Sequence, residues 1–146
     1  MEGIKSRLST LWIFATLNFL YCDVLTLMDP DLLKEFMAGS IGGIRISQGF
    51  LLAAGALVEI PMAMVLVSRI ASHRPNRVAN IVAATIMTAV QLSSLVARTP
   101  APYYVFFSVI EIACTSVIVW YAWKWRGDER ASSSQAESLR GASVAR

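Results

Sequence analysis

Residues 78–97 read VANIVAATIMTAVQLSSLVA, a segment of 20 residues without one ionisable side chain. At about 1.5 Å per residue, an α-helix of this length matches the ~30 Å hydrocarbon layer of a membrane. A helix also pairs its backbone N–H and C=O groups within the segment, as lipid requires. The segment therefore predicts a membrane-spanning helix.

Three further apolar segments accompany it, at about 8–28, 47–68 and 103–123. Only 16% of the residues are charged, whereas an ordinary soluble domain has about 25%. This composition excludes a soluble globular enzyme and a nucleic-acid-binding module. The sequence predicts an all-α fold, an integral membrane four-helix bundle that occupies residues 1–126.

Turn-forming residues separate the predicted helices. Asp29-Pro30 closes the first helix, the polar run at 73–77 links the second to the third, and Thr99-Pro100-Ala101-Pro102 precedes the fourth. Proline cannot continue a helix and restricts the residue before it. These breaks define four separate spans.

The longest connection, residues 29–46, predicts a short interfacial helix between the first and second spans. Asp29 can cap a helix that has Pro30 at its first position, and its apolar residues share one face. Gly39 ends this helix, and Gly42 and Gly43 are expected to keep the remaining connection flexible.

Residues 127–146 differ in composition from the rest of the chain. They are rich in Ser, Ala, Arg and Glu, contain no aromatic residue and offer little apolar surface to bury. We expect a disordered cytoplasmic tail.

The distribution of Lys and Arg predicts the orientation. Eight of them flank the ends of the spans on the side of the termini, and three flank the other ends. The positive-inside rule then predicts that both termini are cytoplasmic. The groups are Lys5, Arg7, Arg69, Arg74, Arg77, Lys124, Arg126 and Arg130 on one side, and Lys34, Arg45 and Arg98 on the other.

Three carboxyl residues fall at membrane depth, where a charge costs at least ~2.5–3.5 kcal/mol. Glu59 is close to the midplane of its span, and Glu111 and Asp23 are further outward. No Lys, Arg or His accompanies them. We expect either a protonated carboxyl that links helices by hydrogen bonds, or a bound cation or ammonium ligand.

Helical spacing aligns these carboxyls with other polar residues, and we expect the polar stripes of all four helices to face a common interior. One stripe is Asn80, Ala84, Thr88 and Gln91, another is Tyr104, Ser108, Glu111 and Thr115, and a third is Gln48, Gly55, Glu59 and Ala63. The candidate ligand- or ion-binding residues are Asn18, Asp23, Glu59, Thr88, Gln91, Tyr104 and Glu111.

Other residues suggest structural roles. Pro61 is expected to kink the second helix beside Glu59. Arg77 and Asn80 are predicted polar contacts on the cytoplasmic side, with Arg77 against lipid phosphate or the end of the second helix. Cys22 and Cys114 form no C-x-x-C pair, so the sequence predicts no metal site, no cofactor and no catalytic residue.

The chain resembles a bacterial family of small four-helix membrane proteins of unknown function. The residues that carry the resemblance are Tyr21-Cys22-Asp23, Asp29-Pro30, Glu59-Ile60-Pro61-Met62 with Met64, Asn76-Arg77 with Asn80, Ile110-Glu111-Ile112, and Trp120, Trp123 and Trp125. The resemblance implies a multi-pass protein of the bacterial inner membrane. It implies no activity, substrate or cofactor.

Three classes of function remain open. The anionic interior favours a protein that binds or translocates a proton, a cation or a small apolar or amine ligand. The small size favours a structural or accessory subunit of a membrane complex, in contact with lipids and with a second copy or a partner membrane protein. A lipid-modifying enzyme that uses Glu59 and Glu111 as acid and base is the weakest alternative.

Overall fold

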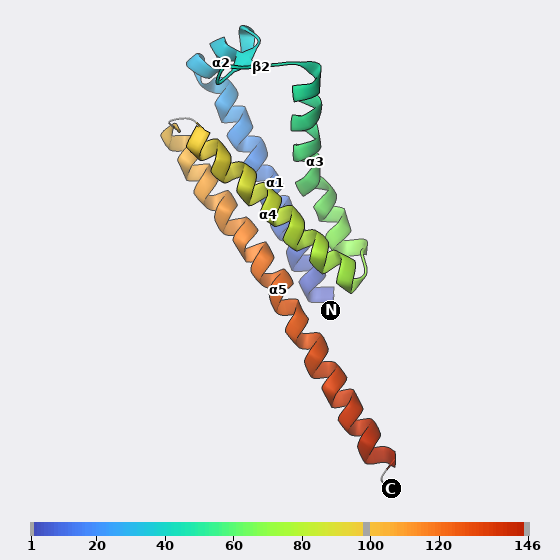
Figure 1. The fold of residues 1–146 in the computed structure, drawn as a ribbon. Coiled ribbons are helices and arrows are strands. Elements are labelled where there is room, and N and C mark those ends of the chain that lie inside the picture. Colours follow the sequence, from blue (N-terminus) through green and yellow to red (C-terminus); the bar gives the residue numbers. More distant parts are fainter. Residues whose placement is uncertain (1, 98–99, 145–146) are drawn as a thin grey trace.

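The computed structural model describes residues 2–97 and 100–144. Its long helices run side by side, and a small cap of one short helix and one hairpin covers one end (Figure 1). We call this end the cap end, and the opposite end, where the chain starts, the N-terminal end. The elements are α1 (Glu2–Met28), α2 (Pro30–Met37), β1 (Ser40–Ile41), β2 (Ile44–Arg45), α3 (Gln48–Ile70), α4 (His73–Ala97) and α5 (Pro102–Val144).

Four of these helices are long and apolar enough to cross a membrane. This result confirms the predicted all-α fold with four spanning helices and a short helix between the first and second. The candidate spans are Gly3–Met28, Gln48–Ile70, His73–Val96 and Pro102–Trp125.

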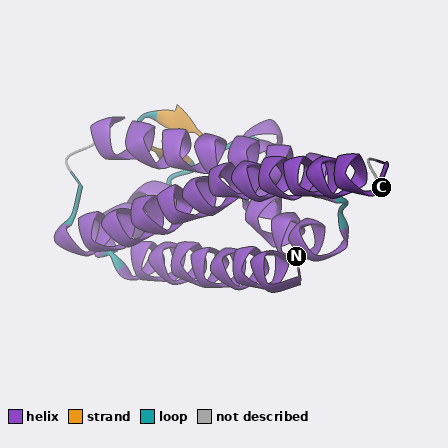
Figure 2. Ribbon diagram, turned by 90° about the horizontal axis from the view of Figure 1, so that it is seen from below, coloured by secondary structure: helices purple, strands orange, loops and turns teal. Residues whose placement is uncertain are grey.

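The four spanning helices close into a ring. Helix α1 packs against α3 and α5, and α4 packs against the same two helices. Figure 2 shows the helices lying side by side from a second direction. Each helix therefore has one face toward a shared interior and one toward the surroundings.

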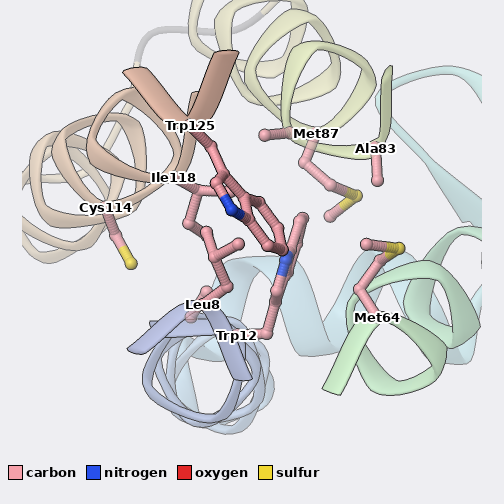
Figure 3. Packing of buried hydrophobic residues seen from close by; sticks show 10 residues of the cluster. Leu8, Trp12, Met64, Ala83, Met87, Cys114, Ile118 and Trp125 are labelled. Carbon is pink, nitrogen blue, oxygen red and sulfur yellow. The ribbon is translucent and has the colours of Figure 1, made fainter. Parts of the chain in front are cut away.

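Apolar side chains fill the interior from the middle of the bundle to the N-terminal end (Figure 3). All four spanning helices contribute, and Trp12 and Ile118 are fully buried. We call this group the apolar layer. It consists of Leu8, Trp12, Ala15, Met64, Ala83, Ala84, Met87, Cys114, Ile118 and Trp125.

The cap is more ordered than the sequence predicts. The side chain of Asp29 caps α2 by accepting hydrogen bonds from the backbone N–H groups of Asp31 and Leu32, with Pro30 at the first helical position. Gly42 and Gly43 adopt positive φ angles of 55° and 79°, which suit the tight turn between β1 and β2. The expected flexible connection is therefore a hairpin, because glycine permits this backbone conformation without steric strain.

Helix α4 begins earlier than predicted. Residues 73–77 form its first turn instead of a separate polar turn, and the backbone N–H of Asn76 donates to the carbonyl of Ser72 at 3.0 Å. Pro75 does not prevent this start, because the first turn of a helix needs no N–H donor at that position.

Helix α5 continues as a single helix to Val144, beyond the boundary at residue 126. Composition predicts disorder for this segment, whereas the structure extends the helix away from the bundle (Figure 1). Ala, Arg, Glu and Gln are good helix formers, so the local preference of the chain is compatible with helix.

Candidate functional site

Helices α4 and α5 bring their predicted polar stripes together in the interior. The side-chain amide of Gln91 donates to the hydroxyl of Ser108 at 2.6 Å, and Ser108 donates to the carbonyl of Tyr104 at 2.7 Å. Closer to the N-terminal end, one turn from Gln91 along α4 and two turns from Ser108 along α5, the hydroxyls of Thr88 and Thr115 lie 2.8 Å apart. A polar seam therefore follows the contact between these two helices.

Glu111 lies in this seam and is the most unusual residue of the bundle. Its side chain is only 1% exposed. Neither carboxyl oxygen has a hydrogen-bond partner among the residues that the structure describes. Leaving a buried polar group unpaired costs about 1–3 kcal/mol, and more for a charged group. The fold thus keeps an unsatisfied carboxyl inside the membrane-spanning region.

Helix α1 supplies the second side of this site. Cys22 is buried on α1, whereas the next residue, Asp23, is exposed. The prediction that Asp23 belongs to a buried carboxyl cluster is therefore not matched by its position, although its charge lies on the same helix as Cys22. Tyr104 lies two helical turns before Glu111 on α5, at a spacing that places both residues on one face of the helix. We call Glu111 with Cys22, Asp23 and Tyr104 the Glu111 site.

A cavity of about 420 Å³ opens above the Glu111 site at the cap end. Tyr104 and Ser94 line it, and the backbone carbonyl of Tyr104 accepts a hydrogen bond from the hydroxyl of Ser108 at 2.7 Å. Gln91 in turn bonds to Ser108 on α5. A chain of polar groups therefore connects the cavity with the interior near Glu111.

Glu59 does not join this site, and the prediction that its stripe faces the interior is wrong. Gln48, Gly55 and Glu59 are all exposed on α3. The face of α3 that packs into the bundle carries Pro61, Met64 and Ser68 instead. Spacing predicts which residues share a face, but the neighbouring helices decide which face is buried.

Pro61 is buried within α3. The ribbon of α3 changes direction in the middle of the helix (Figure 1), as expected from the backbone hydrogen bond that proline removes. The bend lies beside the exposed Glu59 and not beside the Glu111 site.

A second polar network joins α1, α3 and α4 near the N-terminal end, and it contains Asn80, which the sequence predicts as a polar contact. The indole N–H of Trp12 donates to Asn80 Oδ1 at 2.7 Å, and the hydroxyl of Ser68 donates to the same oxygen at 3.2 Å. Asn80 Nδ2 donates to Asn76 Oδ1 at 2.7 Å, and Asn76 Nδ2 donates to the carbonyl of Ser68 at 2.8 Å. The amide side chains of Asn76 and Asn80 in an apolar segment indicate buried hydrogen bonds, but their partners on α1 and α3 are too distant in sequence to be identified from spacing.

Two predicted polar residues have other contacts than expected. Arg77 Nε donates to the carbonyl of Ala122 on α5 at 3.0 Å, so Arg77 links α4 to α5 and not to the end of α3. The amide of Asn18 donates to the carbonyl of Phe14 in its own helix at 3.0 Å. Asn18 is thus bonded locally.

Among the described residues, no group of three or more His, Cys, Asp or Glu side chains is placed to hold a metal ion.

Four helices that are long and apolar enough to cross a membrane surround a buried carboxyl without a hydrogen-bond partner among the described residues, which defines the class of this molecule as a helical membrane protein with a polar interior site. A family of unknown function, DUF6326, matches residues 2–132. The chain belongs to this family, which confirms the resemblance seen in the sequence. No curated protein matches the chain, and no solved structure matches it.

Proposed function

We propose that this protein binds or translocates a proton, a small cation or a small amine at Glu111. The observation that supports this proposal is the pair of buried carboxyl oxygens without hydrogen-bond partners in the described chain. Ionisable residues inside membrane proteins mark ion and substrate pathways, proton relays and ligand counter-ions. A proton or a cation would supply the missing partner.

The surroundings of Glu111 fit a positively charged ligand. Asp23 adds a carboxyl at an exposed position on α1, and no Lys or Arg interaction with either carboxyl is found among the described residues. Tyr104, Gln91 and Ser108 add oxygen and nitrogen atoms between the site and the cavity at the cap end. This end would be the entrance.

The purified protein tests this proposal through its thermal stability, measured against pH and against added lithium, sodium, potassium and methylammonium. We expect one of these ligands to stabilise the wild type by about 3 kcal/mol at a hundredfold excess over its dissociation constant. Glu111→Gln keeps the size of the side chain but removes the carboxylate, so the stabilisation should disappear.

Glu59→Gln is the matched control, since it removes a carboxyl from an exposed position at similar depth. It should retain the full response. Equal ligand and pH responses in wild type and Glu111→Gln would contradict the proposal.

The same proposal places the protein in a bacterial inner membrane with both termini in the cytoplasm. The support is the eight-to-three distribution of Lys and Arg and the family resemblance. Alkaline phosphatase, which is active only outside the cytoplasm, should be inactive when fused after Arg126 and active when fused after Arg45. A strongly active fusion after Arg126 would reverse the orientation and make the cap end cytoplasmic.

A second candidate function, an accessory subunit of a membrane complex, is favoured by one observation. Glu59 is exposed on α3 in the middle of a candidate span, where contact with lipid is costly. A second polypeptide on this face would shield the carboxyl. Cross-linking from a Glu59→Cys variant in native membranes tests for such a neighbour, and its absence would remove this candidate.

A further inference from the structure

We propose that the cavity at the cap end binds a monovalent organic cation with an apolar body, a substituted ammonium. This site is distinct from Glu111, which does not line the cavity. The inference therefore stands whether or not Glu111 binds a proton or a small cation.

The cavity has the size and the walls of a small-molecule site. Its volume of about 420 Å³ lies within the range of roughly 300–1,000 Å³ that is usual for ligand pockets. Its described lining comes from the end of α1, helix α2, the hairpin, the start of α3, the end of α4, residues 100–101 and the start of α5. Leu32, Ile41 and Ile44 provide apolar surface for the body of a ligand.

The charge of the lining selects a cation. Among the described residues that line the cavity, the only charged side chains are Asp29 and Asp31. Asp29 Oδ1 accepts the backbone N–H groups that begin α2, which fixes its position in the wall. Asp31 is paired at 3.4 Å with Lys34, a weak exposed contact, so Asp29 is the principal anionic group.

Three aromatic rings favour an ammonium with alkyl substituents over a hydrated metal ion. Phe50, Tyr103 and Tyr104 all line the cavity. Aromatic rings attract alkylammonium groups through their electron-rich faces, and such groups lose less hydration than a small inorganic cation. The combination of carboxylate, rings and aliphatic walls matches a cation with an apolar body.

Benzyltrimethylammonium is a suitable probe, and neopentylbenzene is its uncharged isostere. Binding of each to the full chain in neutral, choline-free detergent micelles is measured by titration calorimetry, with empty micelles as the blank. We expect saturable binding of the cation and at least about tenfold weaker binding of the neutral compound.

Asp29→Asn is the decisive variant, because asparagine caps a helix as well as aspartate does but carries no charge. We expect it to weaken binding of the cation by about tenfold without altering the melting temperature appreciably. Phe50→Leu should weaken binding to a similar extent through loss of a ring.

Glu35→Gln is the matched control, because Glu35 lies on α2, the helix that Asp29 caps. Its carboxylate accepts the backbone N–H of Gly42 at 2.8 Å, a contact that glutamine can retain, and Glu35 does not line the cavity. Binding should be unchanged in this variant. Equal binding of the neutral isostere, or wild-type affinity in both Asp29→Asn and Phe50→Leu, would overturn the proposal.

A final measurement distinguishes a free ammonium from a lipid headgroup. Addition of phosphatidylcholine to the micelles should weaken binding of the probe if a choline headgroup occupies the same cavity. Unchanged binding would identify a free ammonium as the ligand. Either result is compatible with the proposed chemistry, which the variants test.

Discussion

Replacing Trp12 with alanine should lower the free energy of unfolding by about 3–5 kcal/mol, the cost that large core truncations share. Trp12 is fully buried in the apolar layer, and its indole N–H donates to Asn80. Alanine would leave a cavity among four helices and remove one hydrogen bond. Unfolding in mixed micelles, followed by circular dichroism, measures the loss.

Two comparisons separate packing from hydrogen bonding. Trp12→Phe keeps most of the ring but has no N–H, so we expect a loss of about 1–2 kcal/mol. Trp123→Ala removes the same residue type from a position that is 63% exposed, and it should have little effect. If Trp12→Ala were no more destabilising than Trp123→Ala, the apolar layer would not stabilise the bundle as the structure indicates.

The second large effect has the opposite sign: Glu111→Met should raise the free energy of unfolding by about 1–3 kcal/mol. Methionine has a similar volume and needs no hydrogen bonds, whereas both oxygens of Glu111 lack partners in the described chain. The variant should also lose the change in stability with pH or with a small cation that the proposed function assigns to Glu111. A residue whose removal stabilises the fold and abolishes a response is typical of a functional site.

Gln91→Met is the control for this prediction. Gln91 is buried on the facing helix, but its amide has a partner, the hydroxyl of Ser108 at 2.6 Å. Its replacement should destabilise the protein by about 1 kcal/mol or more. If Glu111→Met were destabilising to the same extent, Glu111 would be a structural residue and the proposed function would fail.

The four spans and the seam between α4 and α5 could be predicted from the sequence. Long apolar segments have few other solutions in lipid, and the spacing of Thr88 and Gln91, and of Ser108 and Glu111, fixes each pair on one helical face. The polar faces of α4 and α5 are expected to be buried because polar groups avoid lipid. The prediction of Glu111 as a buried carboxyl depended on these two facts alone.

The exposed position of Glu59 could not be predicted from the spacing of polar residues. Its stripe is regular, yet α3 packs through Pro61, Met64 and Ser68, and the stripe faces outward. Which face of a helix is buried depends on its neighbours and on the bend at Pro61, and neither is a local property of the sequence. The bond between Trp12 and Asn80 joins residues 68 positions apart, so no spacing rule could identify it.

The apolar layer has an electrical consequence. Between Thr88 and Thr115 on one side and the Trp12–Asn80 contact on the other, the interior offers Ala84, Met87 and Ile118, which give a hydrated ion no ligands. This layer insulates the N-terminal end from the Glu111 site, so much of the transmembrane voltage would fall across it. A charge crossing the full voltage changes its energy by about 2.3 kcal/mol per 100 mV. A cation that reached Glu111 from the cap end would cross only part of that drop, and its occupancy would follow the polarisation of the membrane.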